Sequence, residues 1–319
     1  MVTSASKARF RIGFVFALIA IAMASRTWLL SQPIDKDTPL QPKLSADFDP
    51  LLAQVEKLRP LHIAKRPNRD GDWLERFPEG GQTFAQYVQS RNERPLHSDF
   101  QGIDIQPLGE FDETQLQILE RTAEFMGHYF GVTVQTLPAK PLGEIPDTAK
   151  RLRHDIPQVL TTWILDEVLK PTHRPDAIAT IALVTTDLWP GNLNWVFGQA
   201  SINDRVGVWS LHRNGDPRLG DEAFRLCLRR TLKTAMHETG HMLGIPHCVA
   251  GECCMNGSAS REESDRQPLE FCQECQPKIW WTCNADPAER LEALTEFCDR
   301  EGLSTEATLF RKEWNAIRK

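Results

Sequence analysis

The sequence predicts an α/β fold, and two kinds of segment predict it. Short β-branched or alternating runs, at residues 103–105, 132–136 and 177–186, are typical of strands in a sheet. Longer stretches with apolar residues at helical spacing follow Asp112 and Asp221. Strands that alternate with helices of this length favour a twisted mixed sheet backed by helices.

The N-terminal segment, residues 1–32, has the composition of a secretory signal. Three basic residues precede an apolar run over residues 12–24, which ends in Ala22-Met23-Ala24, a small-x-small sequence typical of a cleavage site. The run is about thirteen residues long, fewer than the roughly twenty that cross a bilayer as a helix. We therefore expect a signal peptide that exports the protein to the periplasm or the exterior. The alternative is an uncleaved N-terminal membrane anchor, and membrane contact is expected only through this segment.

Residues 33–100 form a leader that is rich in proline and charge, in which we expect two short helices. Asp49-Pro50 opens one that runs to about Leu58, and Thr83 caps another that runs through Gln89. We expect this leader to pack on the catalytic domain, which spans residues 101–319.

The elements of the catalytic domain follow in order. Asp112 caps a helix that Gly131 ends, and a second helix opens near Pro157 and runs to about Leu169. The buried strand over residues 177–186 ends at Asp187, and Asp221 is placed to cap the next helix. Near the C-terminus we expect one helix to start at residues 286–287 and end at residue 302, and another to start at residue 304.

The composition is that of an ordinary soluble globular protein, with 41% hydrophobic and 25% charged residues and a net charge of −6. This acidic balance disfavours a nucleic-acid partner, because the phosphate backbone attracts basic surfaces. We expect a monomer.

The helix that follows Asp221 carries His-Glu-x-x-His at His237, Glu238 and His241. Residues four apart lie on one face of a helix, so both imidazoles can reach one ion. Glu238 lies off that face and is placed to bond a metal-bound water as a general base. Gly244 can take the left-handed conformation that reverses the chain and returns His247 to the same metal.

Three neutral imidazoles leave one position of a tetrahedral zinc ion open for water, which is typical of a catalytic site. A zinc-bound water activated by Glu238 can attack a carbonyl polarised by the same ion, and amide hydrolysis is the natural reaction. We therefore predict a zinc-dependent metallopeptidase that acts on peptide or protein substrates. The alternative is a zinc-stabilised peptide-binding protein with little or no turnover, and Glu238 argues against it because a binder needs no base.

The residues after His247 resemble the archaemetzincins, a family of metzincin zinc metallopeptidases. The resemblance rests on Met255 and on four cysteines at Cys248, Cys253, Cys272 and Cys275. It implies that Met255 lies under the catalytic zinc and that the cysteines bind a second, structural zinc. It also implies a metzincin-like twisted mixed sheet with an active-site helix and a small C-terminal zinc-bound subdomain from about residue 248.

The cysteine pattern predicts a zinc site by its spacing as well. The two pairs are separated by a polar stretch, residues 256–271, with too few apolar residues to pack alone. Two zinc ions per chain are therefore expected, one catalytic and one structural. The alternative is one or two disulfides, and Cys254 could take the place of Cys253 as a ligand. Cys227, Cys283 and Cys298 are expected to be buried thiols, although Cys283 and Cys298 could pair after export.

A second resemblance to archaemetzincins lies at Phe197, Gly198, Gln199 and Ala200. In metzincins an edge strand above the active-site helix binds extended substrate by adding it to the sheet, and the resemblance implies that role here. An ordinary internal strand is the alternative. The charged stretch over residues 261–266 is expected to be a solvated loop.

One position departs from a pattern found in some metzincins. Some metzincins have a tyrosine two residues after the methionine, where this chain has Gly257. Zinc itself is therefore expected to carry most of the negative charge that develops on the substrate's carbonyl oxygen, the oxyanion.

Overall fold

The structure is a computed structural model that describes residues 44–91, 100–192 and 194–319. Its helices are α1 Asp49–Leu58, α2 Trp73–Arg76, α3 Phe84–Ser90, α4 Glu113–Phe130, α5 Thr161–Trp163, α6 Asp221–Met242, α7 Arg261–Arg266, α8 Gln276–Cys283, α9 Pro287–Arg300 and α10 Ser304–Ile317. Its strands are β1 Ile103–Leu108, β2 Val134–Thr136, β3 Lys150–Arg153, β4 Ile156–Leu160, β5 Ala179–Val184, β6 Asp187–Trp189, β7 Gly198–Ser201 and β8 Val206–Ser210. The predicted signal segment lies outside the described residues. Within the described ranges, no helix combines the length and apolar character needed to cross a bilayer.

The main sheet has five strands in the order β2-β1-β5-β8-β7, which confirms the predicted mixed sheet. The four strands from β2 to β8 are parallel to their neighbours, and β7 runs antiparallel to β8 at one edge. Neighbouring positions along β5 and β8 face opposite sides of the sheet, as the strand period requires. Ile181 and Trp209 belong to the core on the side of α4 and α6, whereas Ala182 and Val208 belong to a second core on the other side.

A second sheet of three strands, in the order β3-β4-β6, was not predicted. The segment that starts at Pro157 was expected to be helical, but its first part is β4 and only residues from Thr161 on are helical, first as α5 and then as a π-helical segment, Ile164–Leu169. The run of apolar residues is compatible with either structure. Parallel pairing of β4 with β6 decides in favour of a strand.

Helix ends follow the predicted capping residues in most places. Thr83 and Asp112 each accept a hydrogen bond from the backbone N–H three residues later, within a capping box. Gly131 closes α4 in the left-handed conformation. At α6 the prediction was wrong by one residue, because Gly220 occupies the N-cap position and Asp221 is the first helical residue.

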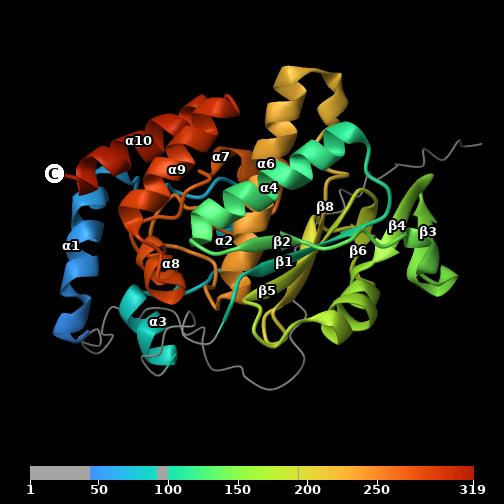
Figure 1. Ribbon diagram of the computed structural model, residues 1–319, viewed down its shortest axis with the longest axis horizontal. Coiled ribbons are helices and arrows are strands. Elements are labelled where there is room, and N and C mark those ends of the chain that lie inside the picture. The colour runs from blue at the N-terminus through green and yellow to red at the C-terminus, as the bar shows by residue number, and fades with distance from the viewer. Residues whose placement is uncertain (1–43, 92–99, 193) are drawn as a thin grey trace, which may run out of the picture.

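The C-terminal helices α8, α9 and α10 lie together at one side of the molecule, with α1 of the leader beside them, while β3 and β4 lie at the opposite side (Figure 1). The leader thus packs on the catalytic domain, as expected. Helix α6 crosses beneath the main sheet, where a Cβ at Gly207 of β8 would lie 3.3 Å from Cε of Met242. This close packing fixes the helix that carries the histidines.

Candidate active site

The three predicted histidines lie together at the C-terminal end of α6 and in the turn that follows. His237 and His241 come from the helix, and Gly244, with a φ of 80°, takes the left-handed conformation that returns His247 to them. All three side chains are buried, and one nitrogen from each lies within 4.8 Å of those of the others.

The hydrogen bonds of two histidines fix their tautomers. Nδ1 of His237 is 2.8 Å from the carbonyl oxygen of Cys254, and Nδ1 of His241 is 2.8 Å from that of Ile245. A carbonyl oxygen only accepts, so each Nδ1 carries a proton and donates. Burial, followed by the neighbouring histidine charge, lowers the pKa of His237 to about 3 and that of His241 well below its ordinary value. Each ring is therefore neutral, with a lone pair on Nε2.

The Nε2 atoms of these two rings face one another at 3.0 Å, although neither carries a proton to share. Nε2 of His247 is also buried and has no hydrogen-bond partner among the described residues. Three buried imidazoles that converge on one point, two of them with unprotonated nitrogens, fit a cation, and zinc is the ion that this donor set most often binds. The residues present therefore fit the predicted catalytic zinc.

Glu79 of the leader holds the third ring. Both of its carboxylate oxygens lie 2.9 Å from Nδ1 of His247, and Nε1 of Trp73 donates to the same carboxylate at 2.7 Å. A carboxylate in this position orients a ligating imidazole and makes its Nε2 a stronger donor to a metal. Trp73 also fills the space beside Gly257, where a Cβ would lie 2.4 Å from Cδ1 of the indole. The leader thus reaches the position where some metzincins have a tyrosine.

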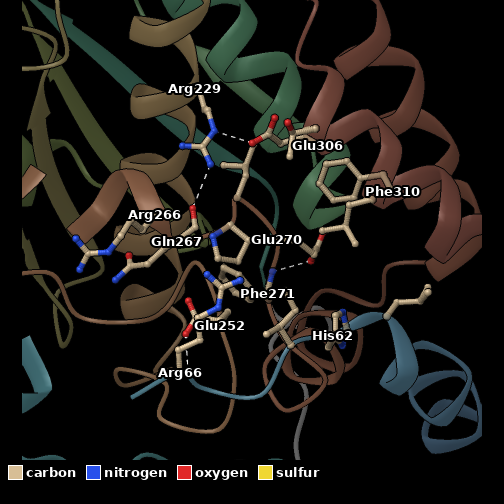
Figure 2. Close-up of a pocket in the computed structure, with 16 residues that line it drawn as sticks. His62, Arg66, Arg229, Glu252, Arg266, Gln267, Glu270, Phe271, Glu306 and Phe310 are labelled. Carbon is tan, nitrogen blue, oxygen red and sulfur yellow. Dashed lines mark hydrogen bonds and ion pairs between the residues drawn. The ribbon is translucent and has the colours of Figure 1, made fainter. Parts of the chain in front are cut away.

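Glu238 is buried beside His237, and both line a small cavity of about 30 Å³. Burial raises the pKa of Glu238 to about 7. A larger cavity of about 220 Å³ lies where residues 61–66, residues 266–271 and α10 meet (Figure 2). Neither Glu238 nor any of the three histidines lines it, so the reaction site is assigned to the small cavity.

Met255 packs directly under the histidine-bearing part of α6. A Cβ at Gly240, between His237 and His241, would lie 2.4 Å from Sδ of Met255, so only glycine leaves room for this contact. The backbone oxygen of Met255 accepts a hydrogen bond from N of Cys248 at 2.8 Å. The methionine therefore connects the histidine cluster to the cysteine cluster.

The four predicted cysteines, Cys248, Cys253, Cys272 and Cys275, form a buried cluster whose sulfur atoms lie within 4.8 Å of one another. All eight cysteines of the chain are free thiols, which argues against the disulfide alternative. Sγ of Cys253 accepts hydrogen bonds from the backbone N–H groups of Met255 and Cys272, at 3.4 and 3.2 Å. These N–H donors favour a thiolate, the form in which cysteine binds zinc, whereas burial and the three neighbouring cysteines raise the pKa of the metal-free Cys253 thiol well above its ordinary value. Cys254 lies apart, with its thiol directed at the carbonyl oxygen of Lys233.

The predicted substrate strand, Phe197 with Gly198, Gln199 and Ala200, is at an edge of the main sheet, because β7 pairs only with β8 in the described sheet. Phe197 also lines the small cavity with His237 and Glu238. The edge position rules out the ordinary internal strand, and the role in substrate binding stays a prediction.

The stretch over residues 261–266, expected to be a solvated loop, is helix α7 and is partly buried. Glu263 accepts hydrogen bonds from the backbone N–H groups of Trp73 and Ala259, and Arg261 lines the small cavity. The charges in this stretch thus serve internal contacts. Roles for Glu79 and Lys233 were not predicted, because Glu79 has no spacing relation to the histidine motif and Lys233, although one helical turn before His237, is of a residue type that is normally exposed.

Comparisons with known proteins found three kinds of similarity. A sequence model described as "Peptidase family M54" matches residues 164–280, which include both clusters. The archaemetzincin-2 of Rattus norvegicus is 30% identical to this chain, in an alignment that covers 79% of this chain and 83% of the rat sequence. The archaemetzincin of Thermococcus kodakarensis is 36% identical, in an alignment that covers 55% of this chain and 93% of the archaeal sequence. A crystal structure of archaemetzincin from Methanopyrus kandleri is 28% identical, covers 59% of this chain and 97% of its own, and has a TM-score of 0.47.

Proposed function

This chain belongs to the archaemetzincin family and is a zinc-dependent metallopeptidase, and we propose how its residues divide the hydrolysis of a peptide bond. His237, His241 and His247 would hold the catalytic zinc through Nε2. The observation that carries this assignment is the convergence of three buried Nε2 atoms, two of which must be unprotonated because their Nδ1 atoms donate to carbonyl oxygens. When bound there, zinc supplies a Lewis acid for the attacking water and the substrate carbonyl.

Glu238 acts as the general base. It follows His237 directly in α6, so a water molecule held at the histidine site would lie within reach of its carboxylate. The carboxylate takes a proton from the water as the water attacks the carbonyl carbon, and it returns that proton to the amide nitrogen, which leaves as an amine when the C–N bond breaks. Burial on all sides keeps competing water away from the reacting groups.

The four cysteines would hold a second, structural zinc. Four thiols at one point, with backbone donors to one sulfur, suit a closed tetrahedral site. Because Cys248 adjoins His247 and its N–H binds the oxygen of Met255, this zinc would hold both the third histidine and the methionine in place.

Substrate enters as an extended peptide that pairs with the free edge of β7. Pairing through main-chain hydrogen bonds tolerates many sequences, as a peptidase requires. Phe197, at the start of this strand, lies beside the cavity that contains Glu238, so a paired peptide would pass over the reacting groups.

The test uses full-length protein that has been loaded with zinc and incubated with a mixed peptide library, with cleavage followed by mass spectrometry. We expect cleavage that a chelator abolishes and added zinc restores. Absence of cleavage by protein with a full complement of zinc would contradict the proposal and favour the peptide-binding alternative.

A further inference from the structure

The cavity beside His237 and Glu238 is small and polar. Its volume of about 30 Å³ is room for roughly two water molecules, which is about the size of one carboxylate group. Besides His237 and Glu238, it is lined by Phe197, Lys233, Arg261 and Gln267 among others. Two of these residues are cations, and their surroundings decide what the cavity can bind.

Lys233 lies one turn of α6 before His237 and is 4% exposed. Its ammonium group donates to the backbone oxygens of Ser264 and Gln267, the latter at 2.5 Å. An ammonium group has three N–H donors, so one is left over. No carboxylate of the described residues lies within ion-pair distance. Burial, followed by the charge of Arg229, lowers the pKa of Lys233 to about 7, against smaller opposing effects of Cys254, Asp265 and Glu306.

Arg261 is the second cation. One guanidinium nitrogen donates to Oδ1 of Asn214 at 3.0 Å and to the backbone oxygen of Arg213, while Nε is buried and has no partner among the described residues. The guanidinium lies over the ring of Phe197, 3.7 Å from its centre. No carboxylate of the part of the chain that the structure describes forms an ion pair with it.

The neighbouring arginines differ from these two residues. Arg229 pairs with Glu306 at 2.6 Å and also donates to the backbone oxygen of Gln267, as Figure 2 shows. Arg230 pairs with Asp265 at 2.5 Å. The fold therefore neutralises the arginines around the cavity and leaves the two cations on its wall without an acidic partner.

A buried charge without a counter-ion is unfavourable, and unpaired cations on the wall of a cavity indicate a site for a ligand. Lys233 has one ammonium N–H, and Arg261 one buried Nε–H, without an acceptor among the described residues, so both can donate to an incoming carboxylate. We propose that the cavity binds the side-chain carboxylate of an aspartate or glutamate that flanks the scissile bond, and that Lys233 and Arg261 determine this specificity. The inference rests on the proposed peptidase function and adds the substrate class.

The test compares matched fluorogenic peptides that differ only in aspartate against asparagine, or glutamate against glutamine, at each position flanking the scissile bond. The readout is the ratio of kcat/KM for the acid to that for the amide. We expect the wild-type protein to favour the acid by about tenfold or more at one position, because charge-assisted hydrogen bonds are roughly twice as strong as neutral ones. Lys233→Met and Arg261→Met should each lower this ratio at least threefold. Lys312→Met, an exposed lysine on α10, is the matched control and should retain it.

Binding gives a second readout that does not depend on turnover. The same peptides are titrated into zinc-loaded Glu238→Gln protein, and we expect the acid to bind about tenfold more tightly than the amide. If Lys233→Met does not fold, Arg261→Met decides. An acid-to-amide ratio close to one at every position flanking the scissile bond would overturn the specificity. A ratio that neither Lys233→Met nor Arg261→Met changes would also overturn it. Failure to cleave any peptide contradicts the peptidase function instead, and the binding comparison then still decides the inference.

Discussion

The contact between the leader and the third histidine leads to a quantitative prediction. Glu79 accepts a hydrogen bond from Nδ1 of His247, with both carboxylate oxygens at 2.9 Å, and its side chain is only 27% exposed. A hydrogen bond to a charged group contributes about 1.5–3 kcal/mol, which corresponds to roughly tenfold to a hundredfold in an equilibrium constant. Loss of an outer partner of a metal ligand costs affinity in the same range.

Glu79→Ala should therefore weaken zinc binding at the histidine site by about 10–100-fold. Glu79→Gln retains an acceptor oxygen but loses the charge, so its effect should be smaller, on the order of tenfold or less. The cysteine cluster should keep its zinc in both variants, because neither change touches it.

The assay is competition for the labile zinc against a chromophoric chelator of known affinity, at neutral pH. Glu75→Gln is the matched control: it lies in the same leader, is exposed, and contacts only the backbone N–H of Gly71 at 3.3 Å among the described residues. It should bind zinc as the wild type does. If Glu79→Ala and the wild type compete equally with the chelator, the carboxylate does not support His247 and the reasoning fails.

Three further predictions concern packing, pH and metal content. Gly240→Ala should lower the free energy of unfolding by about 1–3 kcal/mol in denaturant titrations, because its Cβ would overlap Met255. Gly127→Ala in α4 is the control, because its Cβ would meet nothing closer than 3.4 Å and should not destabilise the protein. Equal stability for both variants would mean that the contact with Met255 is absent. Burial, together with the charge of Glu270, raises the pKa of Glu313 from its ordinary 4.5 to about 7, so stability from this group is complete below pH 4.5 and is lost as pH rises through 7. Urea unfolding at pH 5 and pH 8 should therefore show a smaller fall for Glu313→Gln than for the wild type, by an amount on the order of 3 kcal/mol, and an equal fall in both proteins would contradict the assignment. Metal analysis should find two zinc ions per chain, of which dialysis against a chelator removes one and leaves the other in the cysteine cluster; a native disulfide between Cys248 and Cys272 would exclude this.

The parts of the site that were predictable are those that local sequence determines. His237 and His241 follow from helix periodicity, and Gly244 has the left-handed conformation that its residue type permits. The capping residues Thr83 and Asp112 were likewise readable, because a cap acts within three residues of itself.

The parts that were not predictable depend on contacts between distant segments. Glu79 lies 168 residues from His247 in a segment without periodic structure, so no sequence pattern connects them. Lys233 is buried by packing of residues 264–267 over α6, although lysine is normally exposed. At β4 the residue pattern suits both helix and strand, and only pairing with β6 decides between them.

The central claim is that Glu238 is the base of a zinc peptidase and not a metal ligand. The most direct measurement compares the wild type with Glu238→Gln at equal, full zinc occupancy, using one cleaved peptide. Because glutamine keeps the volume but cannot take the proton, kcat should fall by about 10²–10⁴-fold while zinc content and unfolding stay unchanged. His241→Ala, which removes a ligand, should lose both zinc and turnover. Equal turnover by the wild type and Glu238→Gln at full zinc occupancy would contradict the assigned mechanism.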